Sequence, residues 1–407
     1  TDPSGNVYVV GEVTESGTYY FGSNSYPLSV PVASGYKPVI LKYDSSGAVQ
    51  WGKTCSAGVS SAEGDLWAVA VDSSGCIYAA GSIAGTTTCD FGNGQTATGT
   101  GSTNVVLVKY DSAGSAQWAR TMSSTSSASA IFYSVDIDGQ GNVCAVGHVQ
   151  GTSTYDFGNG ATATGVWSGS NAVVVKYDSS GNAQWACTLA AGSSVGACFY
   201  GVAIDSGGNV YAAGNMSAGT VNFGNDVSAS ATGASGLLVK YSSSGAAQWA
   251  RVGSDYFQSV VVDSSGDIIV VGGTIGKYSP AGVAQWSSAA FTGGYSAVAV
   301  AANGDIYAAE VINGTYTISF GGSAFVAGTC TGVNVVVTKY DQDGVPRWAQ
   351  STTVGADNSY YNSIAVDSSG NLYVVGNMCG ASTYTFGNGV STSGSSTAGS
   401  NSLLVMY

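Results

Sequence analysis

The chain has 407 residues, of which 9% are charged, against about 25% in a typical soluble domain. Its net charge of −13, with only 11 lysines and arginines, excludes the basic surface that nucleic-acid binding requires and disfavours attraction to anionic membranes. No apolar run is long enough to span a membrane, and a hydrophobic content of 44% excludes a disordered low-complexity chain.

Residue usage predicts a secreted or cell-surface protein. The chain is rich in Ser, Thr and Tyr and poor in Lys and Arg, so trypsin-like proteases would cut it rarely. It begins with Thr1 rather than Met, and we expect a processed or trimmed product.

Two segments recur along the chain. The first has the form S-x-A-V-D-S-S-G-N-x-Y-V-V-G, and its copies end at Gly11, Gly81, Gly147, Gly214, Gly272, Glu310 and Gly376. The second has the form V-x-V-K-Y-D-S-S-G-x-x-Q-W-A, with its tyrosine at Tyr43, Tyr110, Tyr177, Tyr241, Tyr278, Tyr340 and Tyr407. Most repeats span roughly 65 residues, a period typical of propellers and solenoids.

Each repeat contains four strand candidates. The first is the V-A-V run, as in 69–71; the second is the Y-V-V run, as in 372–375. The third is the V-L-V-K-Y run, as in 106–110, and the fourth carries the Q-W pair. Short β-branched runs bounded by Gly and Ser turns predict strands, and no helical periodicity is present.

The sequence therefore predicts an all-β, seven-bladed β-propeller of four-stranded antiparallel blades, forming a single domain over 1–407. The predicted blades cover 1–66, 67–132, 133–199, 200–257, 258–295, 296–361 and 362–407.

The connections predict where the blades carry extensions. D-S-S-G follows the first and third strands, so both turns lie at one end of the blade. At the other end the long connection often contains F-G-N-G, as at 91–94, 157–160 and 386–389, and Asn-Gly favours a tight hairpin. We expect hairpin extensions standing on one face of the propeller, with a notch at the fifth repeat, where four residues separate Gly272 from Lys277.

The strand count predicts a ring that lacks one pair of strands. There are seven second and seven third strands, but six first and six fourth strands. Two interpretations stay open: a longer native chain, or protein partners, including further copies of this chain, that pair with the free strand edges.

Together, V-A-V-D-S-S-G-N-x-Y-V-V-G, G-T-x-x-F-G-N-G and V-x-V-K-Y-D-S-S-G-x-x-Q-W-A resemble the bacterial seven-bladed β-propeller repeat (SBBP) family over nearly the whole chain. The resemblance implies a secreted or cell-surface protein and supplies no catalytic residue.

The Y-D-S-S-G-x-x-Q-W stretch is also similar to the tryptophan-docking motif of quinone-dependent dehydrogenase propellers. That similarity implies only that a Trp staples adjacent blades, at Trp51, Trp118, Trp185, Trp249, Trp286 and Trp348. The cofactor-binding residues of those enzymes have no counterpart here, and we expect no cofactor.

Large rings precede the first strand in three adjacent repeats. Trp67, Tyr133 and Tyr200 occupy a position that varies between repeats, directly after a recurring large apolar or aromatic residue. They either bind a sugar or peptide at the mouth of the propeller or plug its channel, and the plug is the simpler interpretation.

Three further residue types bear on chemistry. Asp136 stands where the other repeats have apolar residues, which makes it a candidate ligand-binding residue beside Trp67, Tyr133 and Tyr200, and we expect a hydrated carboxylate that faces the channel. A calcium site is the alternative, but D-x-D-G-Q-G lacks the acidic twelfth position of an EF-hand loop, so no metal is predicted. His148 is the sole histidine and no G-x-S-x-G motif occurs, which disfavours a serine triad. Cys187 and Cys198 flank a short connection that allows a disulfide.

The predicted function is a non-enzymatic, secreted or cell-surface scaffold used in adhesion, in a filament or in a surface layer. The alternative is a carbohydrate- or peptide-binding module that uses the aromatic mouth, and a propeller hydrolase comes third. Fold alone does not decide among these classes.

Overall fold

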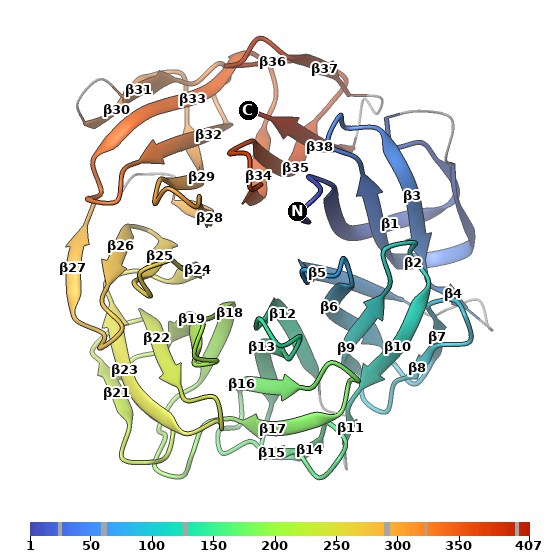
Figure 1. Ribbon diagram of the computed structural model, residues 1–407, viewed down its shortest axis with the longest axis vertical. Coiled ribbons are helices and arrows are strands. Elements are labelled where there is room, and N and C mark those ends of the chain that lie inside the picture. The colour runs from blue at the N-terminus through green and yellow to red at the C-terminus, as the bar shows by residue number, and fades with distance from the viewer. Residues whose placement is uncertain (23–26, 58–62, 125–128, 289–293, 322–323, 395–398) are drawn as a thin grey trace. The chain divides into compact units, whose positions relative to one another are not determined.

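The computed structural model describes the whole chain except residues 23–26, 58–62, 125–128, 289–293, 322–323 and 395–398. It divides into two compact units, Thr1–Gly253 and Ser254–Tyr407. The described residues form strands and turns (Figure 1). No helix that could cross a membrane occurs among them.

The first unit consists of four consecutive antiparallel sheets, each ordered as its strands occur in the chain. The first sheet has three strands: β1 (Val7–Tyr19), β2 (Leu28–Tyr43) and β3 (Val49–Thr54). The other three have four strands each: β5 (Gly64–Val71), β6 (Ile77–Ala84), β9 (Thr103–Tyr110) and β10 (Ala116–Thr121); β12 (Ala130–Ile137), β13 (Val143–Gln150), β16 (Ser170–Tyr177) and β17 (Ala183–Cys187); β18 (Ala197–Ile204), β19 (Val210–Met216), β22 (Ser235–Tyr241) and β23 (Ala247–Gly253).

The second unit repeats this plan in three sheets, the middle one of which also pairs through its last strand with β36 (Thr383–Phe386) of the following repeat. They contain β24 (Phe257–Val262), β25 (Ile268–Gly272), β26 (Ile275–Tyr278) and β27 (Ala284–Ser287); β28 (Tyr295–Val300), β29 (Ile306–Asn313), β32 (Val333–Tyr340) and β33 (Pro346–Val354); β34 (Ser359–Val366), β35 (Leu372–Cys379) and β38 (Ser400–Met406). The predicted all-β propeller class is confirmed. Closure of the sheets into one ring stays a prediction, and each boundary predicted between repeats falls inside a first strand.

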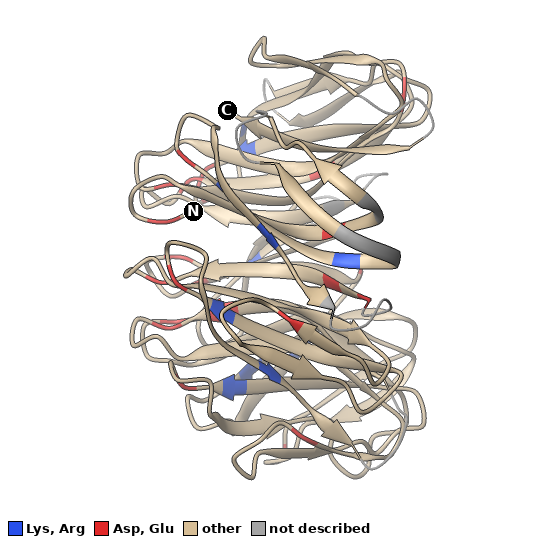
Figure 2. Cartoon of the chain, turned by 90° about the vertical axis from the view of Figure 1, so that its right-hand side faces the viewer, with Lys and Arg blue, Asp and Glu red and all other residues tan. Residues whose placement is uncertain are grey.

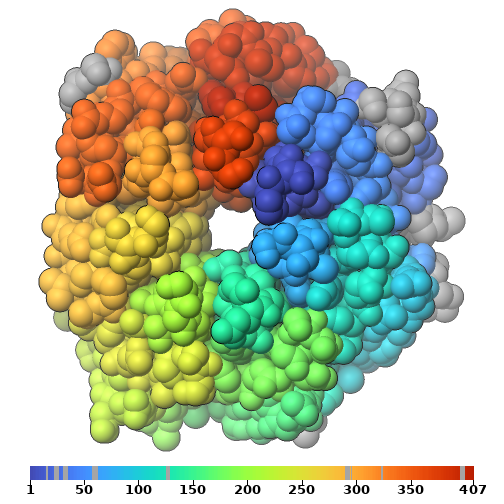
Figure 3. All heavy atoms as spheres, viewed as in Figure 1, coloured from blue at the N-terminus to red at the C-terminus, as the bar shows by residue number. Residues whose placement is uncertain are grey.

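The core lies between successive sheets rather than within one. Tyr78 and Trp118 of one sheet pack with Phe132 of the next, and all three are buried. Alternate side chains of a strand point to opposite faces, so a sheet with neighbours on both sides needs apolar residues on both faces. The V-x-V runs supply them, and Figure 3 shows the neighbouring sheets of the first unit in direct contact.

The D-S-S-G turns are closed by their aspartates. The Asp44 Oδ1 accepts hydrogen bonds from the backbone N–H groups of Ser46 and Ala48 at 2.9 and 3.0 Å. In the turn at Asp138, burial opposes ionisation, but hydrogen bonds from Asn142 hold the pKa of the Asp138 carboxyl below its usual value. Figure 2 draws the aspartates in red, and many of them lie in the loops that join the strands.

The repeated tryptophans contact the turn of the following sheet. Trp118 Nε1 donates to the Ser179 carbonyl at 3.3 Å, 61 residues further along the chain. A Cβ on Gly181 would lie 2.8 Å from the Trp118 ring, and Gly181 has a φ of +78°. The last residue of the turn is therefore glycine for two reasons, its left-handed backbone and the indole against it.

The same contact recurs within both units. Trp51, Trp185 and Trp286 donate to the carbonyls of Ser112, Ser243 and Gln342 at 3.4, 3.0 and 3.1 Å. Trp249 and Trp348 pack on tyrosines of their own sheets, with centroid distances of 6.0 and 6.1 Å to Tyr211 and Tyr307.

Hairpin extensions with strands of their own join the second and third strands of five sheets. In the first sheet β1 and β2 themselves pair as far as Tyr19 with Leu28, and in the fifth only residues 273–274 separate β25 from β26. The extensions are β7 (Thr88–Asp90) with β8 (Thr96–Thr98), β14 (Thr154–Asp156) with β15 (Thr162–Thr164), β20 (Gly219–Asn222) with β21 (Ser228–Ala231), β30 (Thr317–Gly321) with β31 (Ala324–Ala327), and β36 (Thr383–Phe386) with β37 (Ser391–Ser393).

These extensions start at the predicted end of the blade, but they fold back along the fourth strand instead of standing clear of the sheet. Asn93, at the turn between β7 and β8, has a φ of +54° and donates through Nδ2 to the Ala116 carbonyl at 3.0 Å. Phe91 and Ala97 are buried against the sheet, so burial of this apolar side favours the folded-back position. β7 also pairs with β4 (Ser56–Ala57), and β14 pairs with β11 (Ser123–Ser124), in the segments that leave the preceding sheets.

Truncation of one stapling tryptophan tests this contact. We expect Trp118→Ala to lower the free energy of unfolding by about 3–5 kcal/mol, because it empties a buried aromatic site between two sheets. Trp118→Phe keeps a ring but removes the hydrogen bond to Ser179, and about 1 kcal/mol of loss is expected. Urea unfolding measures both, and an unchanged midpoint for Trp118→Ala would contradict the stapling role.

Candidate ligand-binding surface

Each described first strand carries a β-bulge at the same place. The pairing register shifts by one residue, so one side chain in each strand stands outside the hydrogen-bonded ladder. The bulged residues are Trp67, Tyr133, Tyr200, Gln258, Ser296 and Asn362. The residue that varies between repeats is thus the one without a partner residue in the backbone pairing of the first and second strands.

The bulge also explains the glycine that ends the first repeated segment. A Cβ on Gly81 would lie 1.9 Å from the Asp65 carbonyl oxygen, and one on Gly147 would lie 1.8 Å from that of Ile131. The strand that bulges therefore presses its carbonyl against the second strand, where only glycine leaves room.

The sixth repeat departs from this pattern. Glu310 replaces the glycine, and the residue before Tyr295 is Gly294, with a φ of +77°. The left-handed backbone at Gly294 accommodates a side chain on the second strand. Glu310 is buried, its Oε1 has no hydrogen-bond partner in the part of the chain that is described, and burial raises its pKa well above the usual range.

Three bulged residues of the first unit form a continuous set of rings, which we call the aromatic row: Trp67, Tyr133 and Tyr200. The ring centroids of Trp67 and Tyr133 are 5.9 Å apart, and those of Tyr133 and Tyr200 are 5.5 Å apart. Trp67 is 54% exposed, which is unusual for so large an apolar side chain. The structure therefore brings together the three rings that the sequence singled out.

His148 and Cys198 lie beside the row. The His148 ring stacks on Tyr133 with a centroid distance of 5.8 Å, and the Cys198 Sγ is 3.9 Å from His148 Nδ1. Burial lowers the pKa of His148 and raises the pKa of Cys198 to about 12. Both groups are neutral at pH 7, so this pair lacks the thiolate of a cysteine nucleophile.

His148 was not predicted to join the row. His148 lies on β13, where it pairs with Ile131 of β12. It directly follows Gly147, which pairs with Phe132, the residue before the bulged Tyr133. The sequence does place His148 one residue after the repeated glycine. That spacing predicts a place beside Tyr133 only once the β-bulge on the neighbouring strand is known.

Asp136 lies outside the aromatic row. It is three positions from Tyr133 along β12, and its Oδ2 accepts a hydrogen bond from the Ile204 N–H at 2.8 Å. The carboxylate thus obtains a backbone donor from the neighbouring sheet. Asp138 is occupied by Asn142 and by Lys176, whose Nζ is 3.3 Å away, and the described residues contain no cluster of metal-ligating side chains.

The structure directs Cys187 and Cys198 at different groups, and the disulfide considered between them stays a prediction. Both are free thiols here, as are all eight cysteines of the chain. Cys187 donates to the Gly245 carbonyl at 3.1 Å, whereas Cys198 faces His148. β17 is the last strand of its sheet and β18 is the first of the next, so the short connection joins opposite edges of two sheets.

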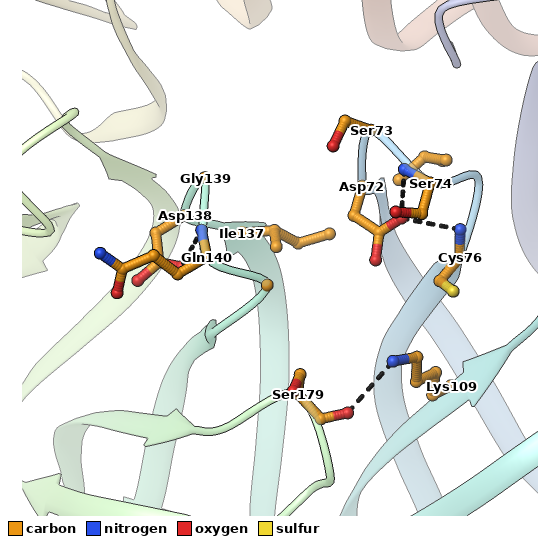
Figure 4. A pocket seen from close by; sticks show the side chains of 12 residues that line it. Asp72, Ser73, Ser74, Cys76, Lys109, Ile137, Asp138, Gly139, Gln140 and Ser179 are labelled. Carbon is orange, nitrogen blue, oxygen red and sulfur yellow. Dashed lines mark hydrogen bonds between the residues drawn. The ribbon is translucent and has the colours of Figure 1, made fainter.

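A pocket of about 440 Å³ lies between the turns of two neighbouring sheets in the first unit (Figure 4). Its polar groups already have partners: Asp72 accepts from Ser74 and Cys76, and Lys109 Nζ donates to the Ser179 carbonyl at 3.1 Å. These hydrogen bonds close the turns or join one turn to the next sheet, so the pocket is a gap between neighbouring repeats and not a ligand site.

The carboxyl of Asp136 gives a pH test. Burial raises its pKa to about 6, above its ordinary value of 3.8, so the folded state retains the proton that the unfolded state has lost. Relative to Asp136→Ala, the wild type should lose about 2–3 kcal/mol of stability as the pH rises from 4 to 7. Urea unfolding at both pH values measures this. Parallel stability profiles for the two proteins would contradict the raised pKa.

The comparisons with known proteins concern the repeat and the fold. The SBBP "Beta-propeller repeat" family model matches residues 350–377, which confirms the predicted repeat in that segment. A search of curated proteins gave no match.

Several solved structures are similar in fold. Virginiamycin B lyase from Staphylococcus aureus is 11% identical over 80% of this chain and 83% of its own, with a TM-score of 0.42. The Cps50 (Swd1) β-propeller domain of Myceliophteria thermophila is 9% identical over 91% and 96%, with a TM-score of 0.45. The Dos1 propeller is 10% identical over 83% and 72%, with a TM-score of 0.40.

Proposed function

Since the chain carries an SBBP β-propeller repeat, we propose that it is a non-enzymatic, secreted propeller that binds carbohydrate through the aromatic row. The observation that carries the proposal is the contact between Trp67, Tyr133 and Tyr200, three bulged residues from three successive sheets. Trp67 is 54% exposed while Tyr133 and Tyr200 are half-buried, so the row offers a ligand one exposed ring backed by two others without any change in the sheet.

The chemistry of the row favours a neutral sugar. Its rings offer apolar faces, and the tyrosine hydroxyls and His148 add polar groups at their edges, the combination that a sugar ring with CH faces and hydroxyls requires. The two interplanar angles are 68° and 55°, so the rings form a curved rather than a flat platform. This shape suits a short or bent saccharide better than a flat polysaccharide surface.

A scaffold role supports the same proposal. The stapled sheets and the closed turns hold the row rigidly, and a rigid site loses less entropy when it binds. His148 and Cys198 beside the row are neutral, so they supply no thiolate nucleophile. The Asp136 carboxylate accepts a hydrogen bond from the Ile204 N–H and does not face the row. These features favour binding over hydrolysis.

Removal of two rings tests the binding function. On a glycan array that gives a signal with the wild type, Trp67→Ala combined with Tyr200→Ala should lower affinity at least tenfold, about 1.4 kcal/mol, because stacking area is lost. Gln258→Ala is the matched control, since it changes a bulged residue that lies outside the row. Trp67 is 54% exposed, so we expect the double variant to stay folded.

Isothermal titration with a glycan from the array gives the affinities, and circular dichroism checks the fold. Equal affinity for the double variant and the wild type would contradict the proposal and leave the rings as a plug.

A further inference from the structure

Two cysteines of the first unit lie in direct contact. The Sγ atoms of Cys55 and Cys89 are 3.0 Å apart, and both side chains are fully buried. Cys55 directly precedes β4, and Cys89 is the central residue of β7. β4 and β7 are paired antiparallel, with Ala57 opposite Cys89, so the backbone already holds the two thiols together. We propose that Cys55 and Cys89 form a disulfide when the chain folds under oxidising conditions.

The corresponding positions in the next two repeats support this pairing. They are held by Met122 with Tyr155 in one repeat and by Leu189 with Val221 in the other, and each pair lies in one buried apolar cluster. The contact is therefore a regular part of the repeat, at which the hairpin extension packs on the segment from the preceding sheet. In this repeat both halves of the contact are cysteine.

Three other buried or half-buried cysteines of the first unit, Cys144, Cys187 and Cys198, have different surroundings. Cys187 donates to the Gly245 carbonyl, and Cys198 lies against His148. Cys144 is fully buried on β13 and stands where the second and fourth sheets have a tyrosine. Their environments direct these thiols to backbone, histidine and core, whereas Cys55 and Cys89 are directed at each other.

The surroundings also distinguish the two thiols. The hydrogen bond from Cys89, aided by the charge of Lys37, lowers the pKa of Cys55, whereas that hydrogen bond and burial raise the pKa of Cys89. Lys37 is a buried residue of β2. In the folded chain Cys55 is therefore the more acidic thiol of the pair.

The reaction is a thiol–disulfide exchange with a small-molecule disulfide such as oxidised glutathione. One of the two cysteines, as its thiolate, attacks one sulfur of that disulfide, and one glutathione thiolate leaves. The other cysteine then loses its proton and attacks the sulfur of the first, which expels the second glutathione thiolate. The net change oxidises two cysteines to one disulfide and reduces one glutathione disulfide to two thiols. Because both sulfurs are buried in the folded chain, the exchange takes place during folding, before the extension closes over β4.

Peptide mapping identifies the product. The full chain is refolded with a mixture of oxidised and reduced glutathione, and the remaining thiols are then alkylated. Trypsin is unsuitable because the basic residues on either side are Lys53 and Lys109, which leaves the pair in one peptide with Cys76. Chymotrypsin cuts after Trp67 and Tyr78 and places the three cysteines on separate peptides. A cross-linked pair of peptides containing Cys55 and Cys89, with the other cysteines alkylated, is expected.

Variants separate the cross-link from the packing. Cys55→Leu with Cys89→Val copies the pair of a neighbouring repeat, so it should fold without a disulfide. The wild type should melt about 5 °C higher when oxidised than when reduced, and this variant should show no such difference. Cys76→Ser is the control and should keep both the cross-link and the shift.

Alkylation of Cys55 and Cys89 after oxidative refolding would overturn the proposal. So would a cross-link from either residue to another cysteine, or an equal melting shift in the Leu/Val variant. None of these outcomes depends on carbohydrate binding.

Discussion

The packing of an indole on the turn glycine of the following sheet is the interaction on which the structure of each unit depends. A four-stranded sheet cannot bury its own two faces, so its stability comes from its neighbours. The contact of Trp118 with Gly181 sets the distance between two sheets at the turn end, and it requires both the glycine and the aspartate that closes the turn. Repetition of that contact explains why the D-S-S-G and Q-W elements occur together in one segment.

The opposite end of the second and third sheets is held by a different contact. There the hairpin extension crosses to the segment that leaves the preceding sheet, as β7 does with β4 and β14 with β11. The asparagine at its tip is bonded back to the fourth strand. In these two repeats the neighbouring sheets are therefore joined through a side chain at one end and through backbone pairing at the other, and the extension is a structural part of the blade rather than an added loop.

The sequence predicted the strands, the turns and the stapling residues because each is a local pattern repeated along the chain. It could not predict the path of the extensions, since the bond from Asn93 to Ala116 joins residues that no local pattern relates. The aromatic row could be predicted only in part. Trp67, Tyr133 and Tyr200 stood out in the sequence because their position varies between repeats, whereas the β-bulge and the place of His148 depend on the pairing register of the strands. The disulfide considered between Cys187 and Cys198 stays a prediction: the sequence showed that the two residues are close along the chain, but not that their thiols face different groups, the Gly245 carbonyl and His148.

The bulge has a consequence for how such a protein can change its specificity. Trp, Tyr, Gln, Ser and Asn all occupy the bulged position in one chain, on strands of the same form. Antibody loops obtain diversity by varying length and conformation, and they become ordered at a cost in entropy when they bind. A bulged strand obtains it by exchange of single side chains on a frame that is already ordered. New ligands are then within reach of point substitutions, with no insertion and no refolding of the sheet.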